Sequence, residues 1–237
     1  MSPNLQTPKP LPRPLTAEEG LATSQPGRKE RERQMRRMEI LGAARKLFAE
    51  RGYEHATLEE IAGGAEFAKG SLYNYFGSKE ELFREVVFSS IDDVERMAAS
   101  ALAPGGNARE VFTEFATRVI EYYKANDDFL RIMAVEMNRI HTGDRRAHLE
   151  DLMQRINRII SILASALRKD IRHKKIVHEN PDDLAHIFLA TVHHRAMRWL
   201  FTERNMRTVD AQQEADFATR LFFDGAVPRP CQGGIHG

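Results

Sequence analysis

The residues best suited to chemistry lie in one short segment of the chain, where hydrogen-bonding side chains surround two hydrophobic ones. The side chains expected to be exposed there are those of Lys69, Gly70, Ser71, Tyr73, Asn74 and Tyr75. Leu72 and Phe76 are four residues apart, so on a helix both would face inward. Asn and Lys can reach base edges in the major groove of DNA, and Ser, Tyr and Lys can bind phosphates. The segment is therefore typical of a surface that reads DNA.

The histidines and glycines do not form a catalytic pattern. His193 and His194 are adjacent and would point about 100° apart on a helix, so they cannot converge on one metal ion. His186 and His193 are seven residues apart and share a face without forming a chelate. Gly105–Gly106 resembles a helix break rather than a phosphate-binding loop, and the single cysteine, Cys231, provides neither a disulfide nor a metal cluster. We expect no enzyme, no metal and no cofactor.

The chain around the DNA-reading segment shows helical spacing of apolar residues. Three helices are expected at about residues 31–51, 57–64 and 69–75. Gly52 and Gly77 are typical helix stops, and Thr57 followed by Glu60 is a capping box that opens the second helix. Three short helices with a tight turn between the second and third match the helix-turn-helix plan, in which the third helix enters the major groove.

These residues resemble the tetracycline-repressor (TetR) family of bacterial regulators. The resemblance rests on residues 40–53 (ILGAARKLFAERGY), 57–62 (TLEEIA) and 69–82 (KGSLYNYFGSKEEL). It implies that Gly70 allows close backbone approach and that the following residues lie near DNA: Thr57, Lys69, Ser71, Tyr73, Asn74, Tyr75 and Lys79. Packing against the next helix is the alternative for Tyr75, and a simple surface charge is the alternative for Lys79. Two positions depart from the family pattern, which commonly has glycine at Glu66 and a Ser or Thr cap at Ala68.

The rest of the chain also has helical periodicity, and no strand pattern occurs. Ser78 and Glu81 form a second capping-box pattern before a helix of about 25 residues. Five more helices are expected after the break at 104–107; the eighth begins at Pro181 and the ninth covers about 209–223. We therefore predict an all-α fold of about nine helices.

Composition sets the expected domain organisation. Of the 237 residues, 42% are hydrophobic and 29% are charged, as in an ordinary globular protein. No apolar run approaches the roughly 20 residues of a membrane span, so a cytoplasmic protein without a membrane partner is expected. Six of the ten prolines fall in residues 1–27, which predicts a flexible tail. We expect a DNA-binding domain over 28–77, a second helical domain over 78–225 and a flexible tail over 226–237.

Basic residues are concentrated at the start of the first helix, although the whole chain has a net charge of only +1. Residues 28–51 contain nine basic and four acidic residues. Such a cluster can mark a phosphate-binding surface. A solvated helix face with charged pairs four residues apart is the equally plausible alternative.

The function that these patterns favour is that of a one-component transcriptional regulator. We expect a repressor that binds a palindromic operator as a homodimer and is released by a small ligand. A constitutive or architectural DNA-binding protein is the alternative, but it would not need some 150 further helical residues. The family commonly pairs its last two helices, and the apolar residues expected at that interface are Leu184, Ile187, Phe188, Thr191, Phe217, Leu221, Phe222 and Phe223.

The family also uses the second domain to bind an effector, so large aromatic and thioether side chains there are candidate pocket residues. They are Phe112, Phe115, Tyr122, Phe129, Met133, Met137, Met153 and Met197, with His193, Arg118 or Arg131 as polar anchors. Core packing is the alternative role for each of them. Few acids interrupt these stripes, which favours a fatty acid or acyl thioester over a cationic drug.

Overall fold

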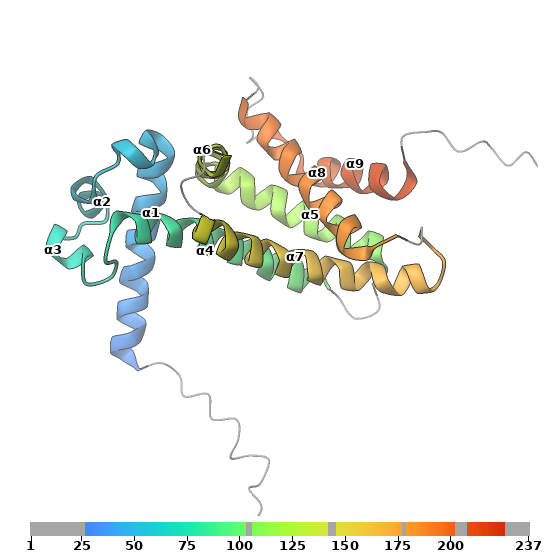
Figure 1. The fold of residues 1–237 in the computed structure, drawn as a ribbon, viewed down its shortest axis with the longest axis horizontal. Coiled ribbons are helices and arrows are strands. Elements are labelled where there is room, and N and C mark those ends of the chain that lie inside the picture. Colours follow the sequence, from blue (N-terminus) through green and yellow to red (C-terminus); the bar gives the residue numbers. More distant parts are fainter. Residues whose placement is uncertain (1–26, 103–105, 142–145, 177–178, 202–207, 226–237) are drawn as a thin grey trace, which may run out of the picture. The chain divides into compact units, whose positions relative to one another are not determined.

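The computed structural model describes residues 27–102, 106–141, 146–176, 179–201 and 208–225 (Figure 1). The predicted tails, residues 1–26 and 226–237, lie outside them. The described residues form nine helices and no strand, so the predicted all-α class is confirmed. The chain divides into two compact units, Met1–Arg37 and Met38–Gly237.

The helices follow one another along the chain with short connections. Their bounds are α1 (Arg28–His55), α2 (Leu58–Gly64), α3 (Lys69–Leu72), α4 (Lys79–Ala101), α5 (Ala108–Ala125), α6 (Asp127–His141), α7 (Arg146–Arg172), α8 (Pro181–Phe201) and α9 (Ala211–Asp224). Side-chain caps fix several starts: Asn107 forms a capping box with Glu110 before α5, and Asp210 accepts a hydrogen bond from the Gln213 amide before α9 at 3.1 Å.

The first and third helices differ from expectation. α1 begins at Arg28 rather than near residue 31. Its regular helical geometry is interrupted at Gly52, the predicted stop, whose φ is 73°, and the bounds reach His55 only across this kink. α3 ends at Leu72, not near residue 75. The amides of Asn74 and Tyr75 bond to carbonyls three residues back, at 3.1 and 3.0 Å, so the helix gives way to tighter turns of the 3₁₀ type.

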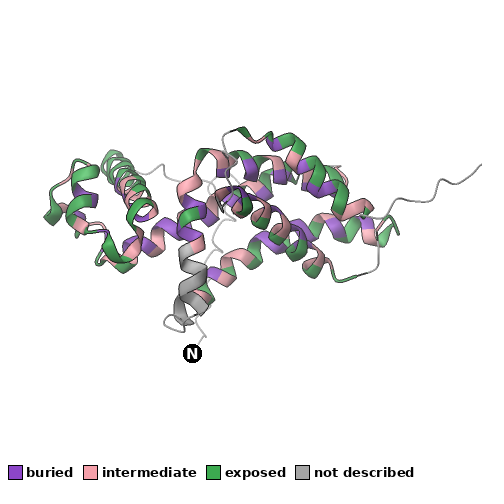
Figure 2. Ribbon diagram, turned by 90° about the horizontal axis from the view of Figure 1, so that it is seen from above, coloured by how far each residue is buried: buried purple, intermediate pink, exposed green. Residues whose placement is uncertain are grey.

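Within the Met38–Gly237 unit, helices α4 to α9 form a bundle. α5 lies along α9, and α7 packs against both α4 and α8. Figure 2 shows that buried residues follow the inner faces of these helices. Phe112, Phe115, Leu163, Phe188 and Trp199 are all at most 2% exposed, and each such side chain contributes roughly 1.5–3 kcal/mol by leaving water.

Candidate functional site

Helix α2 is held at its start by the predicted capping box. The Thr57 hydroxyl oxygen accepts a hydrogen bond from the Glu60 amide at 3.2 Å, and the Glu60 carboxylate accepts one from the Thr57 amide at 3.2 Å. The Thr57 hydroxyl also donates to this carboxylate at 2.9 Å. These bonds lower the pKa of Glu60, with the Thr57 hydroxyl the largest cause and the nearby Arg51 a further one. Thr57 is exposed, and its hydroxyl already serves the cap.

The turn between α2 and α3 contains both departures from the family pattern. Glu66 has a φ of 60°, the left-handed conformation that glycine adopts more readily. Ala68 occupies the cap position of α3 and supplies no side-chain hydrogen bond. The turn is closed instead by the main chain, because the Phe67 amide donates to the Ala62 carbonyl at 2.8 Å.

Helix α3 and the turn after it present most of the predicted DNA-reading residues on the surface. Leu72 and Phe76 are 0% and 1% exposed, so they anchor the segment in the core as expected. The exposed residues are Lys69, Gly70, Tyr73 and Asn74, and Ser71 is half-buried. A Cβ at Gly70 would meet no atom within 4 Å beyond its chain neighbours and its own helix backbone, so the protein leaves this side of Gly70 open.

Tyr75 and Lys69 are more constrained than the rest of this surface. Tyr75 is half-buried, with its ring 6.3 Å from that of Phe67 in an edge-on arrangement. Lys69 forms an ion pair with Glu59 of α2. The hydrogen bond from Lys69 lowers the pKa of Glu59, and Glu59 raises the pKa of Lys69. The pair joins α2 to α3 across the turn.

Lys79 has a structural environment that the sequence did not indicate. Its ammonium donates to the carbonyls of Glu54 and Ala56 at 3.2 and 3.0 Å, and it lies 4.5 Å from the ring centre of Tyr53. The bare carbonyls at a helix end are the usual partners of such a cation. Lys79 therefore ties the end of α1 to the start of α4.

The start of α4 departs from the predicted capping box. The Ser78 hydroxyl accepts the Glu81 amide at 3.0 Å as expected, but the Glu81 carboxylate accepts the amide of Gly77, at 2.9 Å, rather than that of Ser78. Nearby, Phe83 packs edge-on against Phe48 and Tyr53 of α1 at 5.0 and 5.1 Å.

The candidate pocket residues separate into two aromatic groups. The first surrounds Phe112, whose ring lies 4.6, 5.5 and 5.6 Å from those of Phe188, Phe222 and Phe223. These rings come from α5, α8 and α9. Phe112 and Phe188 are fully buried, so this group fills the core, and Phe188 does not lie on the outer surface where a dimer contact was expected.

The second group lies where α5, α6 and α8 meet. Phe129 packs on Tyr122 and Tyr123, at 6.2 and 6.0 Å between ring centres. The Tyr123 hydroxyl lies 3.4 Å from His193 Nδ1. Burial lowers the pKa of His193 to about 4 and raises that of Tyr123 well above its usual value. Near pH 7 both side chains are therefore uncharged hydrogen-bonding groups in an apolar setting.

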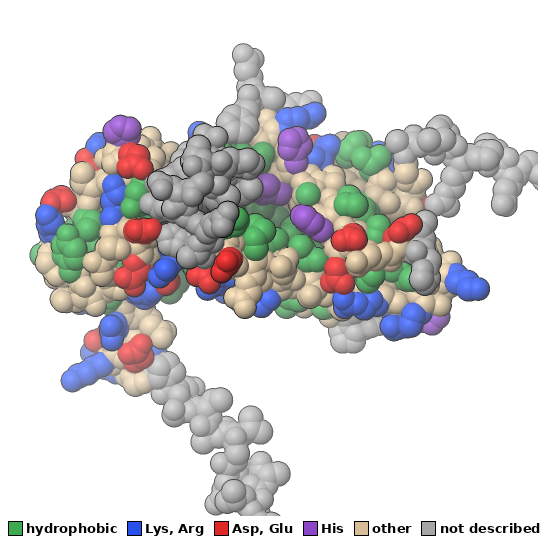
Figure 3. All heavy atoms as spheres, in the orientation of Figure 1, with side chains coloured by type: hydrophobic (Ala, Val, Ile, Leu, Met, Phe, Trp, Pro, Cys, Tyr) green, Lys and Arg blue, Asp and Glu red, His purple; other side chains and the backbone are tan. Residues whose placement is uncertain are grey.

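The remaining candidates are dispersed. Phe115 and Met133 are buried, and Met153 and Met197 are half-buried; the side chain of Met137 lies outside the described residues. On the face drawn in Figure 3, hydrophobic and histidine side chains lie in a hollow of the bundle. The expected anchors Arg118 and Arg131 are instead exposed and paired with Glu114 and Asp127 of their own helices.

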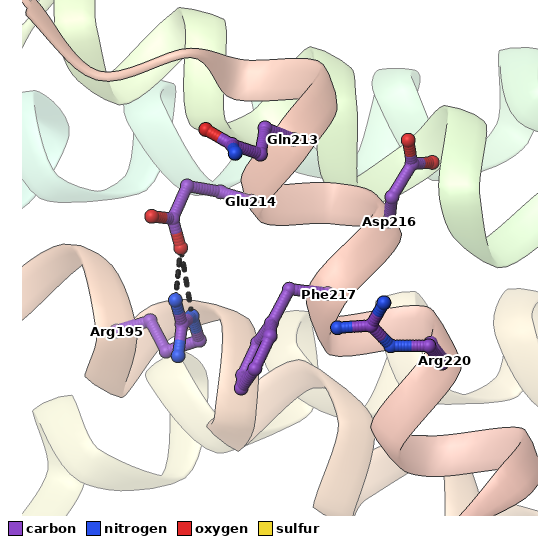
Figure 4. A pocket seen from close by; sticks show the side chains of 6 residues that line it. All are labelled: Arg195, Gln213, Glu214, Asp216, Phe217 and Arg220. Carbon is purple, nitrogen blue, oxygen red and sulfur yellow. Dashed lines mark hydrogen bonds and ion pairs between the residues drawn. The ribbon is translucent and has the colours of Figure 1, made fainter.

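The outer surface of α8 and α9 combines exposed apolar residues with a cavity. Ile187, Phe217 and Leu221 are 58%, 38% and 40% exposed. The cavity, of about 500 Å³, is lined by Arg195, Gln213, Glu214, Asp216, Phe217 and Arg220 (Figure 4). Arg195 bonds Glu214 and stacks 4.2 Å from the ring centre of Phe217. None of the predicted pocket residues lines it.

Two kinds of feature are missing from the part of the chain that the structure describes. Among these residues, no group of three or more His, Cys, Asp or Glu side chains is placed to hold a metal ion. No described helix is long and apolar enough to cross a membrane.

Comparison with known proteins identifies the N-terminal helices. Residues 40–86 match the model of the bacterial regulatory proteins of the tetR family. The chain is 32% identical over 117 residues to the HTH-type transcriptional repressor KstR2 of Rhodococcus jostii, an alignment that covers 49% of this chain and 57% of the relative. The match thus spans little more than half the length of that repressor.

Solved structures share the fold over most of the chain. The regulator FadR of Bacillus subtilis, in complex with stearoyl-CoA, superposes with a TM-score of 0.69 at 18% identity and covers 80% of this chain and 99% of its own. The ketosteroid regulator KstR2 of Mycobacterium tuberculosis superposes with a TM-score of 0.62 at 22% identity, covering 82% and 96%.

Proposed function

This chain belongs to the TetR family of bacterial regulatory proteins, and we propose that it is a transcriptional repressor that releases its operator when a hydrophobic acyl thioester binds. The observation that carries the proposal is the α2–turn–α3 segment within residues 40–86. Its Lys69, Tyr73 and Asn74 side chains are exposed. Leu72 and Phe76 fix the segment on the core.

In this proposal residues 28–77 bind DNA. Asn74 reads base edges, because its amide can both donate and accept at adenine, and Tyr73 and Ser71 position α3 on phosphates. Gly70 lets the backbone approach the duplex. Thr57 and Lys69 add contacts at the edge of this surface, and Lys69 exchanges its ion pair with Glu59 for a phosphate.

The proposed active species is a homodimer formed through α8 and α9 of residues 78–225. Exposed Ile187, Phe217 and Leu221 provide apolar area that a second copy would cover. A two-fold dimer places two recognition helices about 34–36 Å apart, one turn of B-DNA. An effector that shifts α4 changes this separation and weakens operator binding.

The proposed effector site lies where α5, α6 and α8 meet, beside Tyr122, Phe129 and His193. Because burial keeps His193 uncharged, it suits a neutral carbonyl better than a carboxylate. An acyl thioester offers such a carbonyl next to a long apolar chain. FadR of Bacillus subtilis, whose crystal structure is a complex with stearoyl-CoA, takes this chemical class on the same fold.

The test begins with operator selection from a random duplex pool, using the full chain. Electrophoretic mobility shifts on the selected duplex are then measured with stearoyl-CoA, stearate or coenzyme A. We expect release at the lowest concentration with stearoyl-CoA and no release with coenzyme A. Failure to select any sequence would refute the proposal of a transcriptional regulator. Selection without release by stearoyl-CoA or stearate would refute the acyl effector and favour a constitutive DNA-binding protein.

A further inference from the structure

The first turns of α1, residues 28–37, are called the N-terminal arm here. They form the described helical part of the Met1–Arg37 unit. The arm carries six basic and two acidic residues, an excess of four, whereas the excess over the whole chain is one. The match to the tetR-family model begins only at residue 40, so the arm lies outside the family's recognised DNA-binding segment.

The basic residues of the arm are arranged on one face. Lys29, Arg33, Arg36 and Arg37 follow the spacing i, i+4, i+7 and i+8, which places them on one side of a helix. Lys29, Arg33 and Arg36 are exposed and Arg37 is half-buried. These four residues are called the basic stripe below.

The two acidic residues form contacts along the arm itself. Glu32 accepts from Arg28 at 2.8 Å, and Glu30 accepts from Gln34 at 3.4 Å, each pair being four residues apart. Glu30 also lies in the first turn of α1, where a negative charge is favourable. The two acids therefore have local roles on the helix, and the net excess of the arm is four basic charges.

The composition of the arm indicates whether its anionic partner is a membrane or duplex DNA. A helix that lies on a membrane needs a broad apolar face opposite its charges, and the arm has one apolar residue, Met35, which is 62% exposed. A row of cations without an apolar face matches the regularly spaced phosphates of duplex DNA. From Lys29 to Arg37 the stripe is about 12 Å long, and its four long side chains can reach the phosphates of several successive base steps, which follow one another at about 3.4 Å along the duplex axis.

We infer that the basic stripe binds the DNA backbone and supplies affinity that does not depend on sequence. The inference rests on the proposed DNA binding by residues 28–77 and deepens it, because it assigns the sequence-independent part of that binding to the arm. Base contacts by α3 set the operator preference, while the stripe sets how strongly the protein binds any duplex and how steeply salt weakens that binding.

The experiment compares the wild-type chain with the variant K29Q/R33Q/R36Q/R37Q. Glutamine keeps helix propensity close to that of Lys and Arg, and far-UV circular dichroism verifies the helix content. The control, K169Q/R172Q/K174Q/K175Q, removes four exposed charges at the end of α7 and just after it. Affinity for the selected operator and for a scrambled duplex is measured at 50 to 300 mM salt.

The inference predicts that the stripe variant lowers the slope of log affinity against log salt by about 3 to 4. The ratio of operator to scrambled affinity stays within about threefold of wild type, and the control keeps the wild-type slope. A wild-type slope in the stripe variant, or an equal fall in the control, overturns the inference and leaves the proposed function standing. If a parallel assay shows that the stripe variant loses binding to anionic vesicles while its affinity for both duplexes is unchanged, the partner is a membrane and the inference is wrong. Absence of DNA binding by the wild-type chain overturns both.

Discussion

Arg45 Nη1 of α1 donates a hydrogen bond to Asn126 Oδ1, 81 residues further along the chain, at 3.1 Å. Asn126 also closes the end of α5, because its amide and its side-chain nitrogen each donate to the Tyr122 carbonyl at 2.9 Å. The Tyr122 hydroxyl in turn reaches Asp93 of α4 at 3.2 Å. Helices α1, α4 and α5 are thus joined by side-chain hydrogen bonds beside the proposed effector site.

Asn126→Ala should destabilise the protein by about 1–3 kcal/mol, because it removes a helix-end bond and leaves a partly buried guanidinium without this acceptor. Arg45 Nε already lacks a partner among the described residues. Urea unfolding followed by circular dichroism measures the change. Lys124→Ala, two residues away and paired with Glu121 in its own helix, should change stability by less than about 0.5 kcal/mol. Equal effects of the two substitutions on the free energy of unfolding would contradict a stabilising role of the Arg45–Asn126 hydrogen bond.

Asn74→Ala should relax operator preference without affecting folding. A well-placed base contact discriminates by about 1–3 kcal/mol, and Asn74 is exposed. Binding to the selected operator and to single-base variants of it gives the position that Asn74 reads. A uniform loss across all duplexes would show that Asn74 contacts phosphate instead.

Lys79→Ala should lower the free energy of unfolding by about 1–3 kcal/mol, because the carbonyls of Glu54 and Ala56 lose their donor. Lys46→Ala removes an exposed charge from α1 and serves as the comparison. Should Lys79 act only on DNA phosphates, its loss would weaken operator binding and leave unfolding unchanged.

His193 should make stability fall in mild acid. Its pKa is lowered from 6.5 to about 4 by burial, so the unfolded chain takes up a proton at higher pH than the folded one. The stability that neutral His193 contributes is full above pH 6.5 and is lost as the pH falls toward 4, by up to about 3 kcal/mol. Unfolding at pH 7.5 and 5 should show a smaller difference in His193→Gln than in wild type. His186→Gln, at an exposed position of α8, should keep the wild-type difference.

Glu66→Gly should stabilise the turn before α3 by up to about 1 kcal/mol, because glycine adopts a positive φ without the clash that Glu66 bears. Glu66→Ala shares the clash and should bring no such gain. The midpoint of thermal unfolding distinguishes the two variants, and a gain in both would point to the charge of Glu66 rather than its backbone.

The helices were predictable where local chemistry fixes them. Pro181 begins α8 as expected, since proline suits the first helical position, and Thr57 with Glu60 forms the expected box. The contacts of Lys79 with main-chain carbonyls more than 20 residues away leave no local pattern. Tyr123 was missed for a similar reason: its partner His193 is 70 residues distant, and only packing brings the two together.

In the short segment that begins with α3, different residues attach the segment to the core and form its exposed surface. The exposed residues can therefore change in evolution without a change in the buried ones. Leu72 and Phe76 carry its attachment to the core, while Tyr73 and Asn74 project into solvent. Under the proposed function, exchanging the exposed pair changes which operator is recognised and removes no buried surface. If that proposal holds, a duplicated gene can come to regulate other promoters through changes in this segment while its product stays folded.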